Sequence, residues 1–182
     1  MRRIAPLYNC HPSMTVRGAL GLFLTLSIAC ARTSTSPRPQ PSTSSPPVAS
    51  TAPAQAEELV ARTNAQRTTL GLPRLIREGA LMRAAQLQAD QMAALNTMAH
   101  DLPRATYPSL DSRLAAVGYR MQASGENVAE GYPSAAAVLA GWMTSPGHRA
   151  NIVSTRFTQM GAGVATASNG RRFHAQVFGT PR

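Results

Sequence analysis

The chain has 182 residues and carries 18 basic against 8 acidic residues, a formal net charge of +10. All 18 cations are arginines, and five of them lie in residues 1–55, which contain no acid. Residues 56–182 hold the other thirteen arginines with all eight acids, and no three basic residues are consecutive. Because the charge is dispersed among acids, a nucleic-acid-binding surface is not expected.

An uncharged, mostly apolar run covers residues 18–29 and follows Arg17. A membrane-spanning helix needs about 20 such residues, so residues 1–29 are predicted to be a signal peptide. The run ends Leu-Ser-Ile-Ala before Cys30, which is similar to the lipobox of bacterial lipoproteins. Cys30 is therefore the predicted lipidation site; an ordinary secretory signal remains the alternative, and Met14 is an alternative start.

The cysteines agree with export but do not form a disulfide framework. Cys10 belongs to the leader and Cys30 follows it directly, so the folded part contains no cysteine and no disulfide. Residues 30–55 are rich in Pro, Ser and Thr and have almost no large apolar side chain. Such a segment buries too little surface to offset the entropy of ordering, so we predict a disordered tether there and a folded domain over residues 56–182.

Within that domain, apolar spacing predicts helices first and a hairpin last. The expected helices cover residues 56–70, 79–98, 111–117 (with Asp111 or Ser112 as the cap) and 133–144, with a further turn at 148–152. The expected strands cover residues 124–129, 161–167 and 172–178. Asn169-Gly170 between the last two is a strong hairpin signal. This order predicts an α+β fold rather than a βαβ repeat.

Several short strings occur in a fixed order along residues 57–180. They are Ala85-Gln86, Met98-x-His100, Arg113-Leu114, Gly125-Glu126-Asn127-Val128-Ala129, Ser145-Pro146-Gly147-His148-Arg149, Phe157-Thr158, Met160-Gly161-x-Gly163 and Gln176-Val177-Phe178-Gly179. Together they make the chain similar to bacterial members of the CAP superfamily of cysteine-rich secretory, antigen 5 and pathogenesis-related 1 proteins, also called SCP-like. The resemblance implies a CAP domain over residues 56–182, folded as a three-layer α-β-α sandwich with a mostly antiparallel central sheet.

His100 and Glu126 are the first candidates for chemistry, because an imidazole and a carboxylate suit metal ligation or proton transfer. The alternative is a hydrogen bond that closes the core. The resemblance implies a cavity tetrad of two histidines and two acids in the larger CAP proteins. His100 and Glu126 match one of each, whereas Ser145 and Arg156 stand at the other two positions.

His148 is expected to supply a second imidazole if its turn faces the same cavity. His100, Glu126 and His148 would then form an open zinc site or, in an enzyme, the catalytic set. Asn127 is expected to join them in a ligand-binding cavity. The alternatives are that His148 only makes backbone hydrogen bonds, and that Asn127 and Asn151 satisfy loop backbone. Trp142 is expected in the core and His174 as a half-buried packing residue.

The resemblance implies a binding module at the cell envelope or outside the cell. We expect this module to require no cofactor and to be a monomer. Its expected partners are a membrane, through the lipid on Cys30, and a lipid, cell-wall or host ligand. The first alternative is a hydrolase that activates water through His100, Glu126 and His148, with zinc or another divalent cation. The second is a structural envelope protein with a vestigial cavity.

Overall fold

The computed structural model describes residues 51–182. The predicted leader, Cys30 and the tether up to residue 50 lie outside the described residues. The five helices are α1 (Ala52–Thr69), α2 (Gly79–Leu95), α3 (Leu110–Ala116), α4 (Ala135–Thr144) and α5 (Pro146–Val153). The four strands are β1 (Ile76–Arg77), β2 (Met121–Glu130), β3 (Gln159–Thr166) and β4 (Arg172–Pro181). No helix among the described residues is long and apolar enough to cross a membrane.

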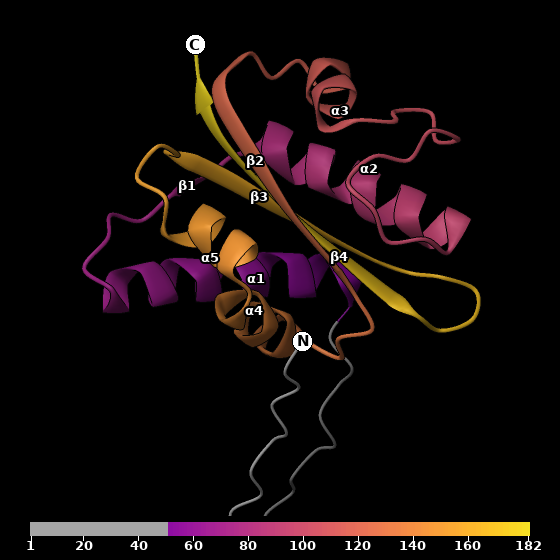
Figure 1. The fold of residues 1–182 in the computed structure, drawn as a ribbon, viewed down its shortest axis with the longest axis horizontal. Helices are drawn as coiled ribbons and strands as arrows, with labels where there is room; N and C mark the ends of the chain where they lie inside the picture. Colours follow the sequence, from indigo (N-terminus) through magenta and orange to yellow (C-terminus); the bar gives the residue numbers. More distant parts are fainter. Residues whose placement is uncertain (1–50) are drawn as a thin grey trace, which may run out of the picture. The chain divides into compact units, whose positions relative to one another are not determined.

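One sheet of order β1-β3-β4-β2 forms the middle layer, and its pairs are antiparallel except for the parallel β1–β3 pair. Helices α2 and α3 cover one face, and α1, α4 and α5 cover the other (Figure 1). The predicted α+β, three-layer α-β-α sandwich is therefore confirmed. Strand β1 was not predicted, because a two-residue strand leaves no periodic signal in the sequence.

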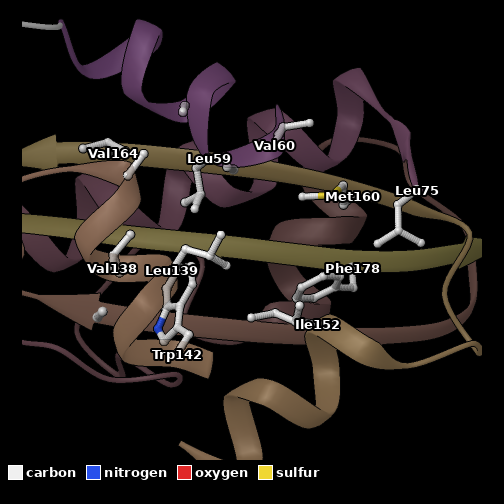
Figure 2. Close-up of a cluster of buried hydrophobic side chains, with 14 of the residues drawn as sticks. Leu59, Val60, Leu75, Val138, Leu139, Trp142, Ile152, Met160, Val164 and Phe178 are labelled. Atoms are coloured by element: carbon white, nitrogen blue, oxygen red, sulfur yellow. The ribbon is translucent and has the colours of Figure 1, made fainter. Parts of the chain in front are cut away.

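Each face of the sheet has its own apolar core, because side chains alternate along a strand. On β4, Phe173, Ala175 and Val177 enter the layer under α2 and α3. The other layer lies under α1, α4 and α5 and is drawn in Figure 2. It includes Leu59, Val60, Val138, Leu139, Trp142, Ile152, Met160, Val164 and Phe178.

Two glycines of β3 let α2 pack directly against the sheet. A Cβ atom at Gly161 would lie 2.2 Å from the backbone of Leu81 and Met82, and one at Gly163 would lie 2.4 Å from the backbone nitrogen of Gln86. A side chain at either position would collide with the helix backbone, so the spacing Gly161-x-Gly163 marks this contact. The α2 helix is in turn placed to carry the loop that holds His100.

The free edge of β3 beyond β1 is closed by side chains of α2. The Gln86 amide accepts from the Val164 nitrogen at 3.2 Å and donates to the Val164 oxygen at 3.0 Å. The Met82 sulfur accepts from the Ala162 nitrogen at 3.1 Å. These contacts occupy backbone groups through which an exposed edge could pair with another chain.

Several element boundaries differ from the predictions. Helix α1 begins at Ala52, inside the expected tether, because Thr51 caps it and Pro53 fits its first turn. Helix α3 is capped by Ser109 in a capping box with Ser112, so the expected caps Asp111 and Ser112 were wrong. The turn at 148–152 is the middle of α5, whose N-cap residue is Ser145.

Arg67 is a buried cation that was not predicted from the sequence. It lies on α1, and its guanidinium donates to the carbonyl oxygens of Pro73, Ile152 and Ser154 at 2.7–2.9 Å. Burial lowers the pKa of Arg67. The contacts hold the end of α1 against the end of α5, where helix carbonyls attract a positive charge.

Candidate functional site

His100 lies in the loop that follows α2. The helix ends at Asn96, whose left-handed backbone (φ 48°) turns the chain back. Gln88, buried on α2, then donates its side-chain amide to the carbonyl oxygens of Ala99 and His100. The loop backbone is therefore fixed from the helix, while the His100 side chain stays 58% exposed.

Glu126 lies on β2 and points into the layer under α2 and α3. Its side chain is 3% exposed and both of its oxygens are used. Oε1 lies 3.0 Å from Nδ1 of His100, and Oε2 lies 2.7 Å from a guanidinium nitrogen of Arg113. The predicted His100–Glu126 pair therefore forms, with an arginine on its buried side.

Arg113 is the residue of the site that was not predicted from the sequence. It lies on α3 with a fully buried side chain, and it also donates to the carbonyl oxygens of His100 and Tyr107 at 3.4–3.5 Å. The available signal was an arginine beside Leu114 on a short helix, within one of the strings that carried the family resemblance. A solvated arginine would give the same pattern, so sequence alone does not reveal its burial.

The environment shifts the pKa values of His100 and His148 in opposite directions. The hydrogen bond to Glu126 raises the pKa of His100, against the opposing effect of burial. Burial lowers the pKa of His148, and the charge of His100 lowers it further. A proton is thus held more firmly on His100 than on His148.

Asn127 is fully buried and is not among the residues that line the pocket described below, so its ligand role stays a prediction. Successive strand residues face opposite sides, and Asn127 is fully buried on the side away from Glu126. Its amide donates to the His148 oxygen at 3.2 Å and accepts from Asn151 at 2.9 Å, and Asn151 also donates to the Glu126 oxygen at 3.1 Å. Asn127 and Asn151 therefore fasten α5 to β2 by satisfying backbone groups, which was the alternative interpretation.

His148 and Ser145 border a pocket of about 310 Å³ beside the edge of β2. The Trp142 ring lies 6.1 Å from the His148 ring, and its indole nitrogen donates to the Val128 oxygen at 3.2 Å. Trp142 is buried, as predicted, and contributes a wall of the pocket. The remaining lining residues are Met98, Val128, Ala129, Glu130, Tyr132 and Gly141.

The residues present do not fit the open zinc site expected of His100, Glu126 and His148. Among residues 51–182, no three His, Cys, Asp or Glu side chains are placed to hold a metal ion. The set of His100, Glu126 and His148 therefore does not form a ligand cluster. Both Glu126 oxygens face Arg113 and His100. Of the two substituted tetrad positions, Ser145 lines the pocket and Arg156 is exposed.

Comparison with known proteins places this chain in one family. The model of the cysteine-rich secretory protein family, CAP, matches residues 60–178. The Bacillus subtilis protein YkwD is 34% identical over 121 residues, which cover 66% of this chain and 45% of YkwD. The chain therefore belongs to the CAP family. The membrane protein YlbC of the same organism is 29% identical over 67% of this chain and 33% of its own length.

Solved structures show the same fold. An extracellular SCP-domain protein of Bacillus anthracis has a TM-score of 0.64 and 30% identity, covering 70% of this chain and 41% of that protein. An outer surface protein of Borrelia burgdorferi has a TM-score of 0.62 and 20% identity, covering 69% of this chain and 92% of that protein. This chain spans less than half the length of the two Bacillus subtilis relatives.

Proposed function

We propose that this chain is an exported CAP-domain binding module, and that the pocket beside β2 holds the apolar part of a lipid or cell-wall ligand. The pocket carries the proposal: Met98, Val128, Tyr132 and Trp142 give it apolar walls, with His148 and Ser145 at its rim. A concave apolar site with a few polar groups is the usual form of a small-molecule site. The names of two structural relatives, an extracellular and an outer surface protein, favour the same location.

Met98 offers a direct test, because it is a pocket residue with 44% exposure that lies outside the buried core. We expect Met98→Gln to weaken retention of the full chain on phosphatidylglycerol vesicles or on purified peptidoglycan roughly five- to ten-fold, because it removes apolar contact area. Leu70→Gln is the matched control, since Leu70 is 42% exposed and is not among the pocket residues. Equal retention of both variants would contradict the pocket as the binding site. If neither the vesicles nor the peptidoglycan retains the wild-type chain, a structural role is favoured.

The anchor has its own test. We propose that Cys30 is lipidated and that the Pro/Ser/Thr-rich stretch behind it spaces the domain from a membrane. Radioactive palmitate should label the wild-type chain and the Cys10→Ser variant, and the Cys30→Ser variant should lose the label. Equal labelling of Cys30→Ser, or an unlabelled wild type, would reject the anchor and leave an ordinary secreted protein.

One observation favours a hydrolase as the second candidate. Glu126 binds Nδ1 of His100, so the other ring nitrogen of this exposed side chain can face a substrate or water. A carboxylate that orients a histidine in this way is the usual support of a general base. If the chain hydrolyses p-nitrophenyl acetate or butyrate, His100→Gln should abolish the activity, while His148→Gln should not. Activity that survives in His100→Gln would exclude this candidate.

A further inference from the structure

We propose that Arg113 is the resident cation of the His100–Glu126 site, and that it supplies from inside the protein the positive charge that a divalent ion would otherwise bring. This role concerns the charge balance of the site and does not depend on which ligand the neighbouring pocket takes. Arg113 has this role because its guanidinium is buried and contacts both Glu126 and the backbone of His100.

Arg113 and Glu126 form a buried ion pair. The Arg113 side chain has no exposed surface, the Glu126 side chain has 3%, and the two lie 2.7 Å apart. A carboxylate removed from water must be compensated by a charge or by several hydrogen bonds. Glu126 receives that compensation from the guanidinium of Arg113.

Both oxygens of Glu126 are already engaged by other side chains. Oε2 accepts from Arg113, and Oε1 faces Nδ1 of His100 at 3.0 Å. An ion bound between the carboxylate and the imidazole would have to displace that hydrogen bond and lie near a fixed positive charge. Among residues 51–182, His100, Glu126 and His148 also do not form a ligand cluster.

The guanidinium of Arg113 also positions the loop that carries His100. Arg113 donates to the His100 carbonyl oxygen, which accepts from Gln88 as well. Arg113 therefore holds both the backbone of His100 and the carboxylate that binds the His100 ring. Arg113 is thus a positioning residue as well as a counter-ion.

The test is a double-mutant cycle on the full chain, read as the urea midpoint of unfolding with and without EDTA. Arg113→Gln leaves Glu126 buried without its cation, so the midpoint should fall. Adding Glu126→Gln to that variant should raise the midpoint again, because the stranded charge is removed. Arg113→Lys should lie closer to the wild type than Arg113→Gln does, whereas a role in packing alone would make the two variants similar.

Arg67→Gln is the matched control. Arg67 is also fully buried, but the partners of its guanidinium are carbonyl oxygens. Glu126→Gln added to Arg67→Gln should therefore give no recovery. The proposal is overturned if Arg113→Gln/Glu126→Gln is no more stable than Arg113→Gln, or if recovery is equal in the Arg67 background.

The comparison with and without EDTA needs no Arg113 variant, so it tests whether the resident cation is a metal even if these variants do not fold. The wild-type midpoint should be the same in EDTA and in excess zinc, and Glu126→Gln should respond in the same way. A wild-type midpoint that EDTA lowers or zinc raises, with the effect lost in Glu126→Gln, would identify a metal as the resident cation and overturn the proposal.

Discussion

The burial of one residue, His174, affects how the stability of the fold depends on pH. The sequence predicted a half-buried side chain, but His174 is fully buried on the face of β4 that also carries Gln176 and Phe178. Neither ring nitrogen has a hydrogen-bond partner among the described residues. Burial, assisted by the charge of Arg172, lowers the pKa of His174 to about 4.

The shift predicts acid sensitivity. In the unfolded chain His174 takes up a proton near the ordinary histidine pKa of 6.5, whereas the folded protein resists protonation until about pH 4. The unfolded state therefore binds more protons in that window, and the free energy of unfolding should fall by up to roughly 3 kcal/mol as the pH drops from 6.5 to 4. Urea titrations at about pH 7, 5 and 4 measure the loss, and His174→Phe should reduce it.

His100 provides the control for that experiment, because its pKa is raised by the hydrogen bond to Glu126. Its contribution to stability is present at low pH and is lost as the pH rises through the folded pKa. His100→Gln should therefore leave the acid-side loss intact. If the pH profile of His174→Phe were parallel to that of the wild type, His174 would not be the group responsible.

At the scale of elements, the contact between α2 and β3 determines where the site forms. Alanines on α2 and glycines on β3 allow the helix to lie directly on the strand, with Ala84, Ala85 and Ala89 all fully buried. The helix thereby positions Gln88, which fixes the loop of His100. Both elements were predicted from the sequence, but Gly161-x-Gly163 was recognised there only as a feature of the family.

A single methyl group should disrupt this contact. Gly161→Ala places a Cβ 2.2 Å from the α2 backbone, which cannot move aside as a flexible side chain can. We expect a loss of roughly 1–3 kcal/mol in the free energy of unfolding, the usual cost of overpacking a core. Thermal or urea unfolding measures it.

Gly147→Ala is the control, because a Cβ there meets no atom within 4 Å. Gly147 lies in the first turn of α5, where alanine also has the better helix propensity. Its stability should therefore stay at or above that of the wild type. Equal losses from both substitutions would show that the close approach of α2 is not the cause.

At the scale of the whole molecule, the fold stands on its two apolar layers without covalent cross-links. No cysteine occurs in residues 51–182, although the family is named for cysteine-rich proteins. We expect the unfolding midpoint of the full chain to be the same with and without dithiothreitol. The Cys10→Ser/Cys30→Ser variant excludes effects of the leader, and a midpoint lowered by the reductant in the wild type alone would show a stabilising role for those cysteines.

The order of the larger elements could be predicted from the sequence, because helical and strand periods are local properties of the chain. Trp142 was likewise predicted as a core residue. The pairing of His100 with Glu126 was predicted through the family motifs. Cap residues such as Ser109 were misplaced, because several Ser and Asp side chains nearby can serve as a cap.

The places where charge matters could be found only from the tertiary packing. The sequence shows thirteen arginines dispersed among eight acids in residues 56–182, but it does not show which of them leave water. Arg67 and Arg113 are the two arginines that are fully buried among the described residues. Arg113 contacts Glu126 only because α3 packs against the face of the sheet on which the Glu126 side chain lies. Asn127, the residue after Glu126, enters the opposite layer because successive side chains of a strand alternate between its two faces. Only the packing of the layers shows which of the two faces holds the site.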